Sequence, residues 1–362
     1  MSSLLVLQDG TCFEGESVGT TGSRIGEVIL NTAVVGYQEI MTDPANAGKI
    51  LVFTYPLIGN CGVADGFNES DRGRPTAIAI KEMSNISSNW QAQNDFGHFL
   101  AQESLVALTE VDTRTLAVKI RRCGEMLGAV STGTKSKAEL LTELASYKEK
   151  PSNDFISDIS VKKVTPLNET GTGPLIGILD LGMLRSFTAQ IVALGCRILL
   201  LPYDIQSQDV KDLKLDGLVI SGGPEEDKSL PSVLETVRQL LGVIPILGIS
   251  TGHEIIARAL GAKLNKLKLG HRGVNYPVIA PGSFKGEITA QNHRLVVDED
   301  SLSAIKGIKV NLHNVNDKTI EEMESASLNM LSVQYYPASP GCGEVNGVFL
   351  RFLEMIERSK GM

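Results

Sequence analysis

One stretch of the sequence has the residue types and the spacing of a nucleophile turn. The apolar run 244–249 ends in Gly-x-Ser-x-Gly at residues 248–252, and an apolar-periodic segment then continues to Gly261. A strand, a sharp turn and a helix in this order form a nucleophile elbow. Its tip side chain faces a reactant, and the first N–H groups of its helix face any anion that forms there. Ser250 therefore occupies the position of a nucleophile.

The elements that would hold Ser250 in place alternate between strand and helix. Apolar strands are predicted at residues 175–179, 197–201, 217–221 and 244–249, with helical stripes at 183–194 and 233–241. Buried strands that alternate with helices predict a mostly parallel sheet flanked by helices. Ligands of such sheets bind beyond the carboxyl ends of the strands, which is where Ser250 and the turn Gly222-Gly223-Pro224 fall.

The chain before this sheet has a different pattern. Strands are predicted at residues 4–7, 27–30 and 50–55. Ser136 and Glu139 form a capping box ahead of a helix with leucines on one face. Residues 148–173 then lose periodicity and are rich in turn formers. We therefore expect a β-rich domain at 1–147, a linker at 148–173 and an α/β domain at 174–362.

Composition and charge narrow the possible functions. A net charge of −8 argues against nucleic-acid binding, since little would release counterions from phosphates. No basic N-terminal segment precedes an apolar run, and no apolar stretch has the length of a membrane span, so we expect neither a signal peptide nor a membrane partner. The five cysteines lack Cys-x-x-Cys spacing, so we expect no metal site, no disulfide framework and a cytoplasmic location.

Several longer motifs occur in an order that is characteristic of one family. In the first half they lie at residues 35–44 (Val-Gly-Tyr-Gln-Glu-Ile-Met-Thr-Asp-Pro), 55–60 and 111–114. In the second half they lie at 261–263, 266–273, 291–293 and 332–334. The chain resembles, over nearly its full length, the small subunit of carbamoyl phosphate synthetase. The resemblance implies a family-specific N-terminal domain and a C-terminal class I glutamine amidotransferase domain.

The resemblance also implies a reaction. In this family a cysteine at the elbow tip attacks the side-chain amide of glutamine, a histidine takes its proton, and a glutamate two residues later orients that histidine. The released ammonia passes to a separate large synthetase subunit, which uses ATP and bicarbonate to make carbamoyl phosphate. The resemblance therefore implies this large subunit as the partner and no cofactor in the present chain.

The present chain departs from the family at all three catalytic positions. Ser250 stands at the nucleophile position and Tyr336 at the histidine position, and the glutamate has no counterpart because the segment after Gln334 is one residue short. A hydroxyl is a weak nucleophile without a base. A tyrosine phenol titrates near ~10, so it keeps its proton at neutral pH. Whether the chain is itself an enzyme stays open, because the Cys-His-Glu relay is absent.

The positions that hold glutamine in the family are altered as well. By resemblance they are Ala45, Gly223, Glu225, Thr251, Glu254, Asn292, Arg294 and Leu295. Alanine replaces a serine at 45, glutamate a glycine at 225 and a glutamine at 254, and arginine a glycine at 294. We hypothesise that Glu225 and Arg294 pair with each other and fill the vacant pocket.

The sequence therefore predicts a glutaminase-deficient small subunit that binds and supports an ammonia-using large subunit, in arginine or pyrimidine biosynthesis. A residual glutaminase that uses Ser250 is one alternative, and an interaction protein no longer tied to a synthetase is another. A serine hydrolase would need His271, His293 or His313 as its base. The first two lie in stretches shared with the family, so we favour a structural role for them.

Overall fold

The computed structural model describes residues 2–148 and 153–361, which form two compact units. Unit 1 comprises Met1–Ser152 and Lys268–Gly273, and unit 2 comprises Asn153–Leu267 and Val274–Met362. The expected β-rich N-terminal part and α/β C-terminal part are confirmed. Residues 149–152 of the predicted linker lie outside the described residues. Its remainder contains a helix and a strand, α5 (Phe155–Ile159) and β10 (Thr165–Asn168).

These two elements of the linker belong to unit 2. The strand β10 pairs antiparallel with β12 (Arg197–Leu201), and Ile156 of α5 is fully buried in the core. The Asp227 carboxylate accepts hydrogen bonds from the N–H groups of Phe155 and Ile156. The turn-rich sequence did not reveal these elements, because they are short and their partners lie far away in the chain.

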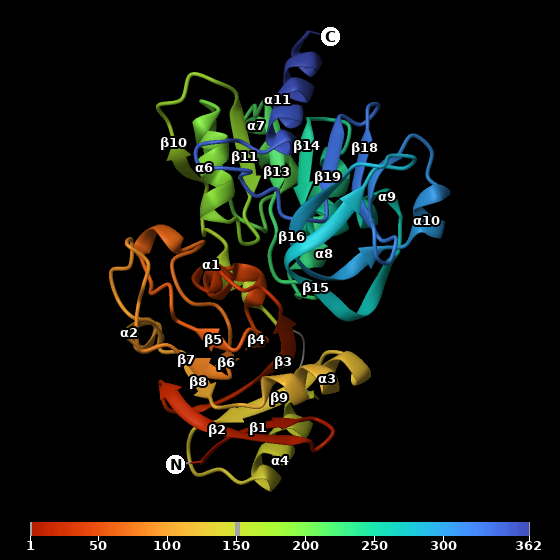
Figure 1. Cartoon of the computed structure of the whole chain (residues 1–362). Helices are drawn as coiled ribbons and strands as arrows, with labels where there is room; N and C mark the ends of the chain where they lie inside the picture. Colours follow the sequence, from red (N-terminus) through yellow and green to blue (C-terminus); the bar gives the residue numbers. More distant parts are fainter. Residues whose placement is uncertain (1, 149–152, 362) are drawn as a thin grey trace. The chain divides into compact units, whose positions relative to one another are not determined.

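Unit 1 is built on a closed seven-stranded barrel in the order β1-β2-β8-β6-β4-β3-β9 (Figure 1). The strands are β1 (Ser2–Leu7), β2 (Cys12–Gly19), β3 (Ser23–Asn31), β4 (Lys49–Phe53), β6 (Ala77–Ala79), β8 (Val106–Thr109) and β9 (Met126–Ser131). Successive strand side chains point to opposite faces. Val28 and Ile50 accordingly join one buried cluster, whereas Ile29 and Leu51 join another.

Short elements cover this barrel. Its helices are α1 (Tyr37–Thr42), α2 (Phe96–Gln102), α3 (Thr113–Cys123) and α4 (Lys137–Lys148), with 3-10 turns at Pro44–Asn46 and Asp65–Phe67. β5 (Leu57–Ile58) and β7 (Glu82–Met83) pair in parallel. The predicted capping box at α4 is confirmed: the Ser136 N–H donates to Glu139 (2.7 Å), and the Glu139 N–H donates to Ser136 Oγ (3.3 Å).

A buried ion pair anchors a distant segment of the chain in unit 1. Arg272 Nε lies 3.1 Å from Glu125 Oε1, and Arg272 Nη2 lies 3.3 Å from Glu125 Oε2. Both side chains are at most 1% exposed. The Gly270 N–H also donates to Glu125 (3.0 Å), and the Glu125 N–H donates to the Lys268 carbonyl (3.1 Å). The segment Lys268–Gly273 therefore belongs to unit 1 although it is remote in sequence.

Unit 2 is organised on a ten-stranded sheet. Its order is β10-β12-β11-β13-β14-β19-β18-β17-β15-β16. The remaining strands are β11 (Leu175–Leu179), β13 (Gly217–Ile220), β14 (Ile246–Ile249), β15 (Leu264–Ile279), β16 (Gly286–Val297), β17 (Lys309–Asn314), β18 (Ile320–Ser325) and β19 (Met330–Val333). The run from β12 to β19 is parallel, as predicted, and antiparallel strands extend it on both sides.

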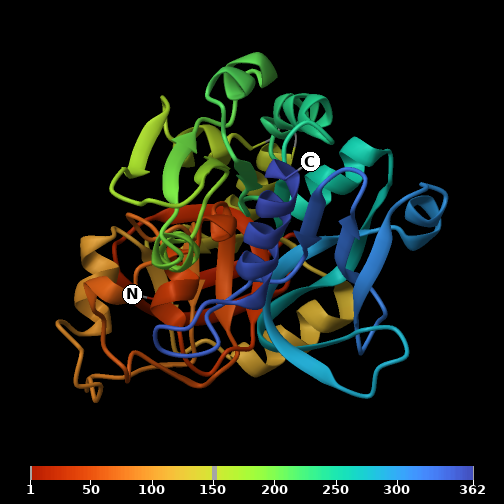
Figure 2. The same cartoon turned by 90° about the horizontal axis from the view of Figure 1, so that it is seen from above.

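Helices cover both faces of the parallel strands (Figures 1 and 2). One face carries α6 (Arg185–Ala193) and the C-terminal α11 (Gly347–Lys360), and the other carries α7 (Ser207–Asp212), α8 (Leu230–Leu240), α9 (Thr251–Leu260) and α10 (Glu299–Ser303). Within the described ranges, no helix has the length and apolarity that crossing a membrane requires.

The Glu125–Arg272 pair gives a stability prediction. Glu125→Leu leaves the Arg272 guanidinium buried without its carboxylate, and breaking such a pair typically costs about 3–5 kcal/mol. We expect the free energy of unfolding of unit 1, measured by urea titration, to fall by about this amount. The double variant Glu125→Leu/Arg272→Met removes both charges and should recover most of the loss. A single variant as stable as the parent would show that the pair contributes little.

Candidate functional site

Ser250 lies at the predicted elbow, between the end of β14 and the start of α9. Its backbone has φ 52° and ψ −113°, a conformation that residues other than glycine rarely adopt. The Ser250 N–H donates to the Val333 carbonyl of β19 (2.8 Å), and the His253 N–H donates to the Ser250 carbonyl (2.8 Å). The side chain is only 1% exposed. The elbow geometry predicted from Gly-x-Ser-x-Gly is therefore confirmed.

Packing explains why both elbow positions are glycines. A Cβ at Gly248 would lie 2.5 Å from Ile256 Cδ1 and 2.8 Å from the Gly252 carbonyl oxygen. A Cβ at Gly252 would overlap the Ile220 carbonyl oxygen of β13. The helix α9 thus crosses the strands at a distance that only glycine permits. These glycines are required by the core, whether or not a reaction occurs at the tip.

The Ser250 hydroxyl has no hydrogen-bond partner among the described residues. The buried His253 does not supply one, because its Nδ1 lies 2.9 Å from Ser332 Oγ and its Nε2 has no partner in the described parts of the chain. Burial lowers the pKa of His253 to about 3, so its ring is neutral near pH 7. No described histidine forms a hydrogen bond with Ser250, and the serine hydrolase alternative therefore gains no support.

The side chain at the predicted histidine position serves as a packing residue. The Tyr336 ring contacts the Phe187 ring edge to face, with centroids 5.7 Å apart and planes at 81°. Its backbone N–H donates to the Ala290 carbonyl of β16 (2.8 Å). Tyr336 is half-buried against the cluster between α6, α11 and the sheet. An aromatic ring in this setting stabilises the core.

The structure brings six of the eight predicted glutamine positions into three local groups. Thr251 Oγ1 donates to the Gly223 carbonyl (2.7 Å), and a Cβ at Gly223 would overlap the Leu181 carbonyl oxygen. Glu225 contacts the backbone of Arg294 and Leu295. Glu254 contacts Gln334. Of the other two positions, Asn292 is buried on β16, and Ala45 belongs to unit 1, where its N–H donates to Asp43 (2.9 Å).

Glu225 and Arg294, which were hypothesised to pair with each other, are joined through the backbone of Arg294. Glu225 Oε1 accepts hydrogen bonds from the backbone N–H of Arg294 (2.7 Å) and of Leu295 (2.8 Å). The Arg294 guanidinium donates through Nε to the Leu267 carbonyl of β15 (2.8 Å). The two residues do meet, as hypothesised. The hydrogen bonds from the backbone of β16 could not be predicted from the sequence, because every residue other than proline carries a backbone N–H group.

Glu254 is a buried carboxyl group beside a second carboxyl group. Its side chain is 2% exposed and accepts a hydrogen bond from Gln334 Nε2 (3.1 Å). Burial raises its pKa well above the usual value, and the adjacent Glu225 raises it further. The raised pKa favours the protonated form of Glu254, which can donate its proton to Glu225. Gln334, which belongs to a family motif, was not predicted as a site residue.

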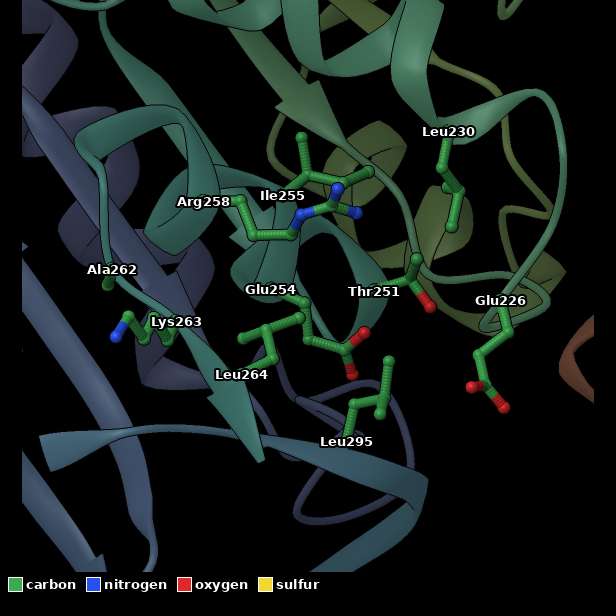
Figure 3. Close-up of a pocket in the computed structure, with 10 residues that line it drawn as sticks. All are labelled: Glu226, Leu230, Thr251, Glu254, Ile255, Arg258, Ala262, Lys263, Leu264 and Leu295. Atoms are coloured by element: carbon green, nitrogen blue, oxygen red, sulfur yellow. The ribbon is translucent and has the colours of Figure 1, made fainter. Parts of the chain in front are cut away.

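A cavity of about 410 Å³ is lined in part by Glu254 (Figure 3). Its walls include Thr251, Glu254 and Leu295, three of the predicted glutamine positions. Figure 3 shows the Glu254 carboxyl pointing toward the space between Thr251 and Leu295. Charged residues at the edge are Glu226, which pairs with Lys266 (2.6 Å), together with Arg258 and Lys263. The remaining walls are apolar: Leu230, Ile255, Ala262 and Leu264.

The raised pKa of Glu254 predicts a pH dependence of stability. A carboxyl group with a raised folded pKa contributes stability that is fully present below its unfolded pKa and lost as pH rises through the folded value. Glu254→Gln keeps a neutral side chain that bonds Gln334 and Glu225. We expect it to raise the free energy of unfolding at pH 8 to 9 by about 1–3 kcal/mol, with little effect near pH 4.5. Urea titrations across this range test the prediction, and an unchanged pH profile would contradict it.

Comparison with known proteins places the whole chain in one family. Residues 5–130 match the model for the carbamoyl-phosphate synthase small chain, CPSase domain, and residues 178–354 match the model for class-I glutamine amidotransferase. The pyrimidine-specific small chain of carbamoyl phosphate synthase from Bacillus subtilis is 36% identical over 361 residues, with 99% of this chain and 97% of the relative covered.

Small chains from other organisms are similar to this chain as well. The small chain from Listeria monocytogenes is 35% identical, with 98% of this chain and 96% of the relative covered. The chloroplastic small chain from Arabidopsis thaliana is 33% identical, with 98% of this chain and 86% of the relative covered. Because these matches span nearly the whole sequence at about one-third identity, the chain belongs to the family of carbamoyl phosphate synthase small chains and carries a class I glutamine amidotransferase domain.

Proposed function

We propose that this chain is a carbamoyl phosphate synthase small subunit that no longer hydrolyses glutamine. The observation that carries the proposal is the isolation of the Ser250 hydroxyl, which has no base or other hydrogen-bond partner in the described parts of the chain. A serine nucleophile needs an adjacent base to take its proton. The members of a catalytic relay act as a unit, so losing one removes most of the activity.

The residues around the elbow support the same proposal. Tyr336, at the position where the resemblance implies a histidine, packs against Phe187. Glu225 and Glu254 introduce two carboxyl groups at positions that the resemblance assigns to glutamine recognition. Glutamine would have to enter beside a carboxylate that already uses the N–H groups of Arg294 and Leu295. In this proposal the tip carries a serine without a base, and Glu225 already accepts from the N–H groups of Arg294 and Leu295.

The proposed role is to bind and support a large synthetase subunit. In this scheme the large subunit makes carbamoyl phosphate from free ammonia, bicarbonate and ATP, and the present chain stabilises it or favours its active conformation. The chain itself needs no cofactor. The proposal also places the protein in the cytoplasm, and its five free cysteines support a reducing compartment. Either arginine or pyrimidine biosynthesis would use the product.

Two rival functions make different predictions. A residual glutaminase would depend on Ser250 and would supply ammonia for carbamoyl phosphate synthesis. An interaction protein no longer tied to a synthetase would bind no large subunit. Among residues 2–148 and 153–361, the contacts described above favour neither rival over the main proposal.

The first experiment measures glutamate release from glutamine by the purified chain, alone and with a large synthetase subunit. We expect release at the level of the Ser250→Ala variant. Ser250→Cys should also show no turnover, because a thiol at this position still lacks the histidine and glutamate of the relay. Ser250-dependent glutamate release at a rate that matches carbamoyl phosphate formation would replace this proposal with the residual glutaminase.

The second experiment tests the partner by co-purification with the large subunit, followed by an ammonia-dependent assay. We expect a stable complex, and more carbamoyl phosphate formed over time than by the large subunit alone. Ser250→Ala should form the same complex, since Ser250 is buried and only 1% exposed. Absence of any complex would favour the unrelated interaction protein.

A further inference from the structure

Two successive backbone N–H groups of β16 converge on a single oxygen atom. Arg294 N–H and Leu295 N–H donate to Glu225 Oε1 at 2.7 and 2.8 Å. Glu225 is about 70 residues away in sequence, in the loop that follows β13. Successive N–H groups that point at one spot form an anion-binding concavity. The anion that occupies it here is part of the chain.

The surroundings of Glu225 extend this set of donors. The buried Glu254 carboxyl forms a further hydrogen bond with Glu225, so an O–H group joins the two N–H groups. Gln334 Nε2 in turn donates to Glu254 Oε1 and holds it in place (3.1 Å). Two oxygens of one carboxylate can accept all of these bonds, and bonds to a charged acceptor are the stronger ones. The chemistry of the donors therefore selects a carboxylate.

Space for a ligand lies next to the same donors. Leu295 contributes one of the two N–H groups, and it also lines the cavity of about 410 Å³ (Figure 3). Glu254 and Thr251 line that cavity as well. Small-molecule sites commonly have volumes of roughly 300–1,000 Å³. Removing the Glu225 side chain would thus leave carboxylate donors open to a cavity of suitable size.

We propose that the Arg294–Leu295 N–H pair is a carboxylate-binding site that Glu225 occupies from within the chain, and that an amino-acid carboxylate binds there once Glu225 is removed. A tethered carboxylate acts at an effective concentration on the order of millimolar or above, so it excludes free ligands that bind weakly. This inference deepens and rests on the proposed function, because it explains by competition why the site does not take up glutamine.

The experiment compares Glu225→Gly with Glu226→Gly. Both variants remove one carboxylate from adjacent positions, but Glu226 is exposed, pairs with Lys266 and has φ 56°, which glycine adopts easily. Thermal unfolding is followed in acetate and in chloride at equal ionic strength. We expect acetate to raise the melting temperature of Glu225→Gly by several degrees relative to chloride, and to leave the parent and Glu226→Gly unchanged.

A binding measurement then identifies the ligand class. Isothermal titration with L-glutamine and L-glutamate should show binding to Glu225→Gly at least about tenfold tighter than to the parent chain. Equal responses of Glu225→Gly and Glu226→Gly to acetate, or no gain in amino-acid binding, would overturn the proposal. Neither result would affect the proposed lack of glutaminase activity, which the glutamate-release assay tests separately.

A third variant keeps the test decisive if Glu225→Gly does not fold. Glu225→Gln fills the same space and can still accept from both N–H groups, but it has no charge. We expect it to fold with a melting temperature below that of the parent and to show no response to acetate, because its amide occupies the site. A melting temperature equal to that of the parent would show that the donors do not select a charged group, and would overturn the proposal.

Discussion

The close crossing of α9 over the parallel strands is the constraint on which the C-terminal unit depends. Gly248 and Gly252 leave no room for a Cβ, because Ile256 and the Ile220 carbonyl oxygen fill the space. With both sides of the turn fixed in this way, the residue between them adopts φ 52° whatever its side chain. The elbow therefore persists for reasons of packing, and its presence is weak evidence that its tip still carries out a reaction.

Polar groups near the elbow have a different role from the one that the family resemblance implies. Glu225 joins the loop after β13 to β16, and Glu254 joins α9 to the end of β19 through Gln334. Buried polar groups are tolerated when they are hydrogen-bonded, and here the protein supplies these bonds itself. Glu225 and Glu254 are thus part of the internal structure of the unit.

The N-terminal unit shows the same dependence on distant residues. Its barrel is closed where β1 pairs with β9, with Leu4 opposite Ser131. The buried ion pair between Glu125 and Arg272 adds a segment from the second half of the sequence. Both side chains of this pair are at most 1% exposed. The pair matters for stability mainly because either charge, if buried without its partner, would strongly destabilise the folded unit. Sequence order alone would assign Lys268–Gly273 to the other unit.

The sequence by itself determined several strands of each unit, the elbow, the capping box at Ser136 and the family, because these depend on periodicity and on motifs within short windows. It also indicated that the Cys-His-Glu relay is missing. Only the tertiary structure revealed the contacts that Glu225 and Glu254 form near the elbow. The N–H groups that hold Glu225 belong to the backbone, and the raised pKa of Glu254 depends on burial beside Glu225. Neither property belongs to a residue type, since both arise when segments far apart in sequence come together.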